Sequence, residues 1–333
     1  MSRPFALDRA MARHLMGNKV RRVKRFPFVT MLEPLEACNL ACIGCGRVRE
    51  YRDVIDRRLS VEESMRAVRE AGAPIVSISG GEPLLHEQIG DLVRAIRDDG
   101  RFMYLCTNGL LLQEKLDQFR PSRRLCFVVH LDGTEAIHDK VTQRVGTYQT
   151  AISAIREALA RGHRVCTNTT LFHGSNVEDL HALFATLTKL GVEGLMVSPG
   201  YAYEDAPDHE LFLQQQESIR VFREVLDPSK GFPFYNNPLY LDFLRGDRTY
   251  PCAAWTTVTY TVKGWRLPCY ALADRHVDDV NELYKDEVWE AYGPGVDRRC
   301  AQCMMHSAFE GASILGALRR PRDLVRVARG VWG

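Results

Sequence analysis

The stretch VEESMRAVREAGAPIVSISGGEP, residues 61–83, carries the pattern that decides the fold. Apolar residues recur at helical spacing up to Gly72, a short β-branched run follows, and a glycine-rich polar cluster ends it. The same order recurs along the chain, with short apolar runs at 28–33, 75–79, 102–107, 125–132, 165–170 and 194–198. Strands that alternate with helices of this length form parallel sheets, so the sequence predicts an α/β fold.

Each apolar run ends in a polar or glycine cluster. In chain order these clusters read EACNLACIGC, SGGEP, CTNG, HLDG, TNTT and SPGYAYE. Parallel α/β folds bind ligands at the carboxyl ends of their strands, so six such clusters in succession predict one site on that edge. No G-x-G-x-x-G follows the first run, which weakens the dinucleotide-binding alternative. Six strand–helix units are compatible both with a doubly wound sheet and with part of a barrel.

Composition limits the class of protein. The chain has 333 residues, 45% of them hydrophobic and 26% charged, the balance of an ordinary globular protein. No apolar stretch approaches 18 uncharged residues, and the N-terminus lacks the apolar core of a secretory signal, so a cytoplasmic location is expected. Ten cysteines in a reducing compartment then indicate metal binding, a cluster, redox chemistry or burial rather than disulfides.

Positive charge is concentrated at the two ends. Residues 1–25 carry +7 and residues 318–333 carry +4, which leaves −9 for the rest of a chain of net charge +2. Residues 3–25 alternate basic and apolar side chains, so a basic amphipathic helix lying on anionic lipid is expected. Peripheral contact with a membrane is favoured over nucleic acid, for which no stacking-aromatic motif is present; no nucleic-acid partner is expected. A plain solvated face stays open.

Three cysteines follow the first apolar run as C-x₃-C-x₂-C: Cys38, Cys42 and Cys45. Thiolates are soft ligands, and three within eight residues can hold three corners of an iron–sulfur cube. The absence of a fourth cysteine at matching spacing leaves one iron open, as a catalytic metal requires. A zinc knuckle is the alternative, but it would need C-x₂-C pairs and four ligands.

The combination of C-x₃-C-x₂-C with SGGEP resembles the radical S-adenosylmethionine (SAM) superfamily, over roughly residues 25–225. The resemblance implies a partial (β/α)₆ TIM-like barrel with a cysteine-containing C-terminal extension. It implies a 4Fe–4S cluster on the three cysteines, with SAM chelated to the open iron as cosubstrate. Gly80, Gly81 and Glu82 are then the strip that binds the SAM amino group, because glycines allow close approach and a carboxylate pairs with an ammonium.

Further SAM contacts follow from weaker matches. HLDG (residues 130–133) resembles the SLDG of related enzymes, which makes Asp132 a candidate for the ribose hydroxyls. Arg144 is a candidate for the SAM carboxylate, and Asn168 and Ser198 end runs on the same edge. For each residue taken singly, turn or capping chemistry is the alternative.

Seven further cysteines lie outside the first motif. Cys252, Cys269, Cys300 and Cys303 resemble the auxiliary-cluster extension called a twitch domain, which implies a second cluster or a zinc site; buried thiols are the alternative. Cys126 and Cys166 lie inside apolar runs and are expected in the core. Cys106 ends the third run on the site edge, where its thiol could donate a hydrogen atom to a substrate radical or could simply pack.

The resemblance narrows to the adenosylhopane synthases, the radical SAM proteins of hopanoid biosynthesis. It rests on LEPLEACNLACIGCG, SISGGEPLLHEQIG, YLCTNGLLL, VVHLDG, SPGYAYEDAPDHE, LDFLRGDRTYPCAAW and CAQCMMH in order. It implies that a 5′-deoxyadenosyl radical adds to the exocyclic alkene of the triterpene diploptene, with a lipidic substrate and a flavodoxin or ferredoxin as reducing partner.

One departure from this family pattern lies in the extension. The family's HCGYE is HSAFE here, residues 306–310, so a family cysteine is replaced by Ser307. A paralogue acting on a nucleoside or sugar therefore stays open, as does a non-catalytic metal- or nucleic-acid-binding protein. The expected organisation is a basic segment at 1–25, a barrel at 26–230, the extension at 231–317 and a basic tail at 318–333.

Overall fold

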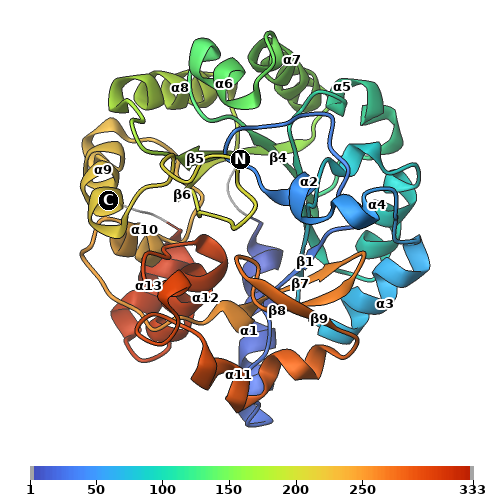
Figure 1. The fold of residues 1–333 in the computed structure, drawn as a ribbon, viewed down its shortest axis with the longest axis vertical. Helices are drawn as coiled ribbons and strands as arrows, with labels where there is room; N and C mark the ends of the chain where they lie inside the picture. Colours follow the sequence, from blue (N-terminus) through green and yellow to red (C-terminus); the bar gives the residue numbers. More distant parts are fainter. Residues whose placement is uncertain (1–3, 331–333) are drawn as a thin grey trace.

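The computed structural model describes residues 4–330 and shows a partial barrel built on one sheet (Figure 1). The sheet has the order β6-β5-β4-β3-β2-β1-β7-β8-β9. Strands β1 to β6 pair in parallel, β7 pairs in parallel with β1, and β7, β8 and β9 are antiparallel. The strands are β1 (Val29–Leu32), β2 (Ile75–Ile78), β3 (Phe102–Thr107), β4 (Leu125–His130), β5 (Arg164–Leu171), β6 (Gly194–Pro199), β7 (Thr257–Thr261), β8 (Gly264–Pro268) and β9 (Ala273–Val277).

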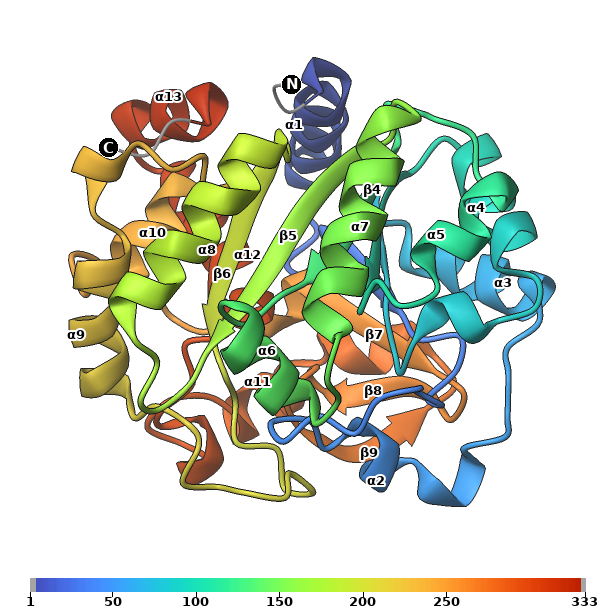
Figure 2. The same ribbon diagram turned by 90° about the horizontal axis from the view of Figure 1, so that it is seen from above.

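Helices cover the outer face of the parallel strands (Figures 1 and 2). In chain order, the helices of the described residues are α1 (Phe5–Val20), α2 (Arg47–Glu50), α3 (Val61–Ala71), α4 (Ile89–Asp98), α5 (Leu112–Lys115), α6 (Glu135–Thr142), α7 (Thr147–Ala160), α8 (Val177–Leu190), α9 (Gln215–Val225), α10 (Pro238–Leu244), α11 (Asp286–Ala291), α12 (His306–Ala317) and α13 (Pro321–Arg329). The six predicted strands and the predicted partial barrel with a C-terminal extension are therefore confirmed.

The helix of the opening stretch shows why these segments fold locally. Ser60 caps α3 by accepting a hydrogen bond from the Glu63 amide, and the Glu63 carboxylate accepts one from the Ser60 amide at 2.7 Å. Gly72 ends α3 in the left-handed region, at φ 69°. The helix thus begins and ends at residues that the sequence specifies.

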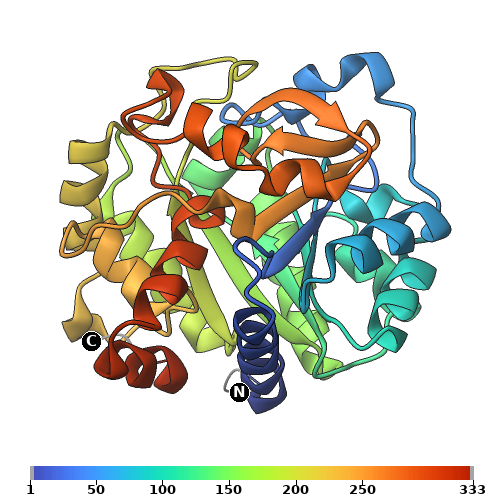
Figure 3. The same ribbon diagram turned by 90° about the horizontal axis from the view of Figure 1, so that it is seen from below.

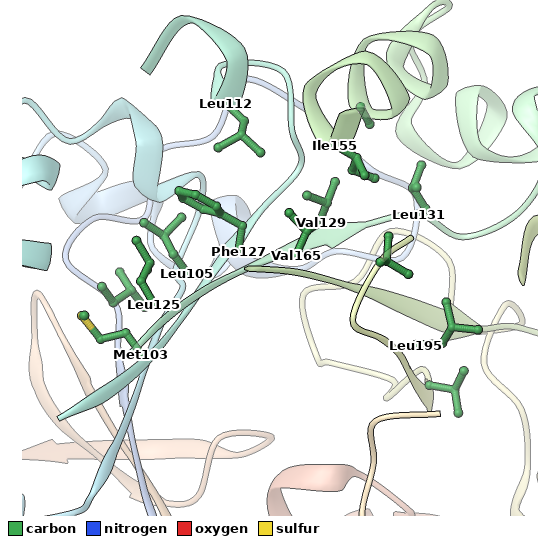
Figure 4. Packing of buried hydrophobic residues seen from close by; sticks show 14 of the residues in the cluster. Met103, Leu105, Leu112, Leu125, Phe127, Val129, Leu131, Ile155, Val165 and Leu195 are labelled. Carbon is green, nitrogen blue, oxygen red and sulfur yellow. The ribbon is translucent and has the colours of Figure 1, made fainter. Parts of the chain in front are cut away.

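Alternation along the strands divides the core into two. Outward side chains such as Leu105 and Phe127 pack against Leu112 of α5 and Ile155 of α7 (Figure 4). Inward side chains form a second cluster inside the barrel, built on Cys126, Val128 and Cys166, with Tyr104, Cys106, Met196 and Tyr235 packed against them. Cys126 and Cys166 are fully buried, as expected.

The beginnings of the strands are covered by α1. Its Leu7 and Met11 are buried against Phe28, Ile75 and Phe102, at the start of the first three strands. The expectation that the whole apolar side of residues 3–25 faces lipid is therefore wrong for Leu7 and Met11, which belong to the core. Residues 1–3 and 331–333 of the two basic ends lie outside the described residues. Among residues 4–330, none of the helices combines the length and apolar character of a transmembrane span.

Candidate active site

The three N-terminal cysteines lie on the loop that leaves the carboxyl end of β1. Cys38 and Cys42 are partly buried and Cys45 is exposed. The Ile43 amide donates to the Val141 carbonyl of α6 at 3.0 Å, which fixes the loop against the barrel edge. Burial raises the pKa of Cys38 to about 11 and that of Cys42 to about 12, so both would lose a proton on binding iron.

The glycine strip packs against this cysteine loop. A Cβ atom at Gly80 would lie 2.2 Å from the Leu35 carbonyl oxygen, and one at Gly81 would lie 2.1 Å from that of Ala37. The Gly81 amide donates to the Leu35 carbonyl at 3.0 Å. Both glycines are therefore required by the contact between the two loops, before any ligand is considered.

Glu82 is buried, whereas a carboxylate that pairs with the SAM amino group would be expected to face an open site. Its side chain is 1% exposed. Its carboxylate accepts hydrogen bonds from the Leu84 amide at 3.0 Å, from the Thr107 hydroxyl at 2.8 Å and from the Asn108 amide at 2.8 Å. Burial raises the pKa of Glu82 to about 7. The residue joins the end of β3 to the SGGEP turn, and a direct contact with SAM stays a prediction.

Asn108 is a residue at this edge that the sequence did not single out. Its side-chain amide donates to Asn39 Oδ1 at 2.7 Å and lies 3.9 Å from Cys38 Sγ. The available signal was its place in CTNG, directly after a strand on the predicted edge. Asn108 thereby joins the end of β3 to the cysteine loop.

Asp132 is engaged by its own neighbours rather than free for a ligand. Its carboxylate lies 2.7 Å from His130 Nε2 and accepts from the Thr170 amide at 2.9 Å. Burial alone would lower the pKa of His130, but the Asp132 carboxylate outweighs this effect and the pKa is raised. Asn168 Nδ2 lies 3.3 Å from His130 Nδ1. The structure thus brings Asp132 and Asn168 together through His130 and ties the ends of β4 and β5.

The two remaining candidates for SAM contacts lie in different surroundings. Ser198 is buried near the carboxyl end of β6. Arg144 lies on the exposed turn between α6 and α7, and its side chain pairs with no carboxylate in the described residues. Neither is joined by a hydrogen bond or ion pair to the cysteine loop within residues 4–330, so their roles stay predictions.

Cys106 points into the barrel, as strand alternation requires. Its sulfur lies 3.6 Å from Ser77 Oγ and packs with the inward cluster, whereas Leu105 belongs to the outer core. Burial raises the pKa of its thiol to about 11, so it carries its proton at neutral pH. Because Asn108 lies two residues further along, Cys106 is one layer below the cysteine loop.

The four C-terminal cysteines line a single small pocket. Cys252, Cys269, Cys300 and Cys303 share this pocket with Ser307. Burial raises the pKa of Cys252 to about 12. Within residues 4–330, no three His, Cys, Asp or Glu side chains are arranged closely enough to hold a single metal ion. The four thiols nevertheless converge from segments far apart in the sequence.

A buried charged network below the cysteine loop was missed from the sequence. Arg47 pairs with Glu33 at 3.1 Å, and Arg266 of β8 pairs with Glu50 at 2.6 Å. Arg47 and Arg266 are 6% and 1% exposed. The sequence alone could not reveal this network, because Arg266 and Glu50 lie more than 200 residues apart. It ties the C-terminal hairpin to the segment that follows Cys45.

Soft sulfur donors on an accessible loop, with a glycine strip packed beside them, fit an iron–sulfur cluster and a second ligand at the carboxyl edge of a partial barrel. Comparison with known families agrees. Residues 32–187 match the radical SAM superfamily, and residues 195–327 match a domain of unknown function, DUF3463. Residues 32–187, just under half of the chain, are therefore assigned to the radical SAM superfamily, whose members use a 4Fe–4S cluster and SAM.

Curated relatives are distant. A GTP 3′,8-cyclase of Clostridium perfringens is 28% identical over 59% of this chain and 62% of its own length. An Fe-coproporphyrin III synthase of Methanosarcina barkeri is 28% identical over 45% of this chain and 38% of its own. A probable GTP 3′,8-cyclase of Methanocaldococcus jannaschii is 24% identical over 77% and 89%. The chain thus spans less than two thirds of the length of the first two.

Solved structures share the fold. Streptococcus suis SuiB bound to its precursor peptide SuiA has a TM-score of 0.69 at 17% identity, covering 93% of this chain and 76% of SuiB. SuiB bound to S-adenosylmethionine has a TM-score of 0.62 at 16% identity, over the same 93% of this chain and 76% of SuiB. The likeness therefore extends through the C-terminal extension as well as the barrel.

Proposed function

We propose that this radical SAM protein adds the 5′-deoxyadenosyl group of SAM to the alkene of an apolar acceptor, with the triterpene diploptene as substrate and adenosylhopane as product. The sequence resemblance that runs through the extension supports this acceptor. A bound cluster would supply the electron that cleaves SAM. Cys38, Cys42 and Cys45 would hold that cluster, and Gly80 and Gly81 would shape the place of SAM beside it.

The observation that carries the choice of acceptor is the neutrality of the barrel wall. Strands β1 to β6 contain one Lys, Arg, Asp or Glu, which is Arg164. Arg164 pairs with Glu193 at 2.5 Å, so its charge is already compensated. Inward residues such as Val128 and Met196 are apolar. A wall without uncompensated charge favours an uncharged acceptor over an anionic one, since a buried phosphate needs cationic partners.

Cys106 is proposed as the hydrogen-atom donor. Addition of the adenosyl carbon to the terminal alkene carbon forms one carbon–carbon bond and leaves a tertiary carbon radical. The Cys106 S–H bond breaks, its hydrogen atom completes the product, and a thiyl radical remains. A reducing partner of the flavodoxin or ferredoxin class then returns one electron, and water returns one proton. The inward position of Cys106, one layer below the cysteine loop, supports this role.

Other assignments belong to the same proposal. Glu82, Asp132, Asn168, Arg144 and Ser198 are proposed to contribute to SAM binding, the first three by shaping the edge rather than as unpartnered ligands. The thiols of the C-terminal pocket are proposed to hold a second cluster or zinc. A cytoplasmic location with peripheral membrane contact is part of the same proposal.

A nucleotide acceptor is the second candidate. Two of the relatives above are GTP 3′,8-cyclases, one of them matched over 77% of this chain. A nucleoside triphosphate would need cationic side chains from loops outside strands β1 to β6. The one cationic Lys or Arg in these strands, Arg164, is already paired with Glu193. The two candidates differ in product: addition gives an adenosyl adduct, whereas hydrogen abstraction from a sugar gives free 5′-deoxyadenosine.

The test is anaerobic incubation of cluster-loaded, reduced protein with SAM and either diploptene or GTP, followed by mass spectrometry. We expect an adenosyl adduct with diploptene, and no SAM cleavage when Cys38, Cys42 and Cys45 are all changed to Ala. Free 5′-deoxyadenosine with GTP and no adduct with diploptene would favour the nucleotide candidate instead.

Cys106→Ala tests the hydrogen donor. We expect it to cleave SAM and still couple, but to give oxidised or epimeric products in place of the reduced adduct. Cys126→Ala is the matched control, because Cys126 is a fully buried thiol of the same inward cluster and should leave the product unchanged. The normal reduced adduct at the normal rate from Cys106→Ala would place the donor elsewhere.

A further inference from the structure

Exposed apolar side chains gather at one end of the molecule. Seven of the ten large apolar side chains exposed in the described residues lie within 5–23 or 318–325. These segments form or adjoin α1 and α13, which lie next to each other beside the beginnings of the strands (Figures 2 and 3). Scattered exposed apolar residues are ordinary, but a gathering of them on one face marks an interaction surface.

Helix α1 has two distinct apolar sides. Leu7 and Met11 face the barrel. Phe5, Met16 and Val20 are 74%, 66% and 79% exposed. At about 100° per residue, these three lie within an arc of about 60° on the opposite side of the helix. The solvent side of α1 therefore carries an apolar stripe that the fold leaves uncovered.

Helix α13 extends the same surface. Leu324 and Val325 are 41% and 49% exposed. The single acidic residue of the helix, Asp323, is turned inward and accepts hydrogen bonds from Arg248 at 2.8 and 2.9 Å. Arg322 stays exposed. The outer side of α13 is thus apolar and basic, because the carboxylate of Asp323 is turned away from it.

Uncompensated positive charge surrounds these apolar side chains. Across residues 4–330, no ion pair with a carboxylate is formed by the exposed side chains of Arg9, Arg13, Lys19, Arg22, Arg322 and Arg329. Arg9 and Arg13 fall at about 40° and 80° from Phe5 around α1, within or beside the apolar stripe. Basic side chains that flank an apolar stripe complement the anionic headgroups and acyl boundary of a bilayer.

We propose that the joint face of α1 and α13 binds a bilayer that contains anionic phospholipid. Phe5, Met16, Val20 and Val325 enter the headgroup region, and the surrounding arginines and lysine contact the lipid phosphates. A nucleic acid would satisfy the charges, but it would leave the apolar stripe in water.

The docked orientation follows from the fold. The face covers the beginnings of the strands, whereas the cysteine loop leaves the carboxyl end of β1. A docked molecule therefore holds its cysteine loop away from the bilayer, open to a soluble reducing partner. The proposal needs no particular acceptor, so its test is separate from that of the proposed function.

The test is cosedimentation with phosphatidylcholine vesicles prepared with and without phosphatidylglycerol. We expect binding to the anionic vesicles alone, weakening as salt is raised. Each basic residue at an anionic surface contributes roughly fivefold, so Arg9→Gln/Arg13→Gln/Lys19→Gln should bind roughly 100-fold more weakly. Phe5→Ala/Met16→Ala/Val20→Ala should also lose binding while its melting temperature stays near that of the wild type, because these side chains are exposed.

The matched control is Arg66→Gln/Lys140→Gln/Arg275→Gln, which removes three exposed charges from α3, α6 and β9. It should bind vesicles as the wild type does. Equal weakening by this control, or no wild-type binding to anionic vesicles at low salt, overturns the proposal. So does binding to duplex DNA or RNA that depends on the same α1 residues while vesicles are left unbound. Leu324→Ala/Val325→Ala on α13 provides an independent variant should the α1 variant lose its fold.

Discussion

Glu82 holds the end of β3 to the SGGEP turn, which makes it a structural residue first. Glu82→Ala would leave the donors of Leu84, Thr107 and Asn108 without their acceptor in a buried place. Unsatisfied buried donors cost about 1–3 kcal/mol each, so we expect the free energy of unfolding to fall by about 3 kcal/mol. Urea denaturation of the protein without SAM measures it.

The control for Glu82 is Glu87→Ala. Glu87 is exposed and close in sequence, and its change should alter stability by less than about 0.5 kcal/mol. If Glu82→Ala keeps its stability and loses SAM affinity alone, the carboxylate is a ligand contact after all.

The buried imidazole of His138 leads us to expect that the free energy of unfolding falls in acid. Its Nδ1 lies 3.2 Å from the Asp132 amide, and burial lowers its pKa to about 4 from an ordinary 6.5. Between these values the unfolded chain binds the proton and the folded protein does not, so stability falls as pH drops through this window, by about 1.4 kcal/mol per pH unit.

His138→Asn should make that pH dependence shallower, because an Asn oxygen can accept from the Asp132 amide without titrating. His209→Asn changes an exposed histidine and should leave the slope as it is. Urea denaturation at several pH values between about 4 and 7 measures both. An unchanged slope for His138→Asn would mean that another group controls acid unfolding.

The SGGEP turn and the cysteine loop are in direct backbone contact, so a shift of one should displace the other. Gly81→Ala places a Cβ atom 2.1 Å from the Ala37 carbonyl and 2.4 Å from that of Glu36, and both are backbone atoms that cannot rotate away. We expect a loss of about 2 kcal/mol in unfolding free energy and a reduced iron content after anaerobic reconstitution.

Gly17→Ala is the control for that variant. Gly17 lies within α1, and its nearest neighbour for a Cβ atom is the flexible end of Arg21 at 4.0 Å. The change should be neutral or stabilising by up to about 1 kcal/mol. Full iron loading in Gly81→Ala would show that the cysteine loop can shift without losing its shape.

The strands and helices of the barrel were predictable because their signals are local. Apolar periodicity, the Ser60 cap and Gly72 lie within the segment that they shape. The partners of Glu82 and Asp132 were not predictable, since Glu82 meets Thr107 and Asp132 meets the Thr170 amide across neighbouring strands. The sequence identified the edge where chemistry gathers, but not which side chains there are already engaged.

The C-terminal extension continues the sheet of the barrel through strands β7, β8 and β9. Strand β7 pairs with β1 from Val29↔Thr257 to Leu32↔Tyr260, so residues 257–277 extend the sheet that holds the cysteine loop. The boundary at residue 230 stays a prediction. The pairing of β7 with β1 could not be predicted from the sequence, because the two strands lie more than 200 residues apart.

This continuity predicts a single unfolding transition. All four tryptophans lie at or beyond residue 255, so their fluorescence reports on the C-terminal third, whereas far-UV circular dichroism reports mainly on the helices. We expect the two urea midpoints to coincide. Separate midpoints would show that the extension unfolds independently of the barrel.

The network of Arg47, Glu33, Arg266 and Glu50 limits how the chain can be recombined with its relatives. A chimera that kept this barrel but took its C-terminal hairpin from another protein would remove Arg266 and leave the partly buried Glu50 with Arg47, at 3.2 Å, as its remaining ion-pair partner. Removing one member of a largely buried group of paired charges is destabilising, because the remaining charges lose part of their compensation. The exchangeable unit is therefore not the hairpin alone: a graft must carry residues 33–50 together with β8, two segments more than 200 residues apart in the sequence.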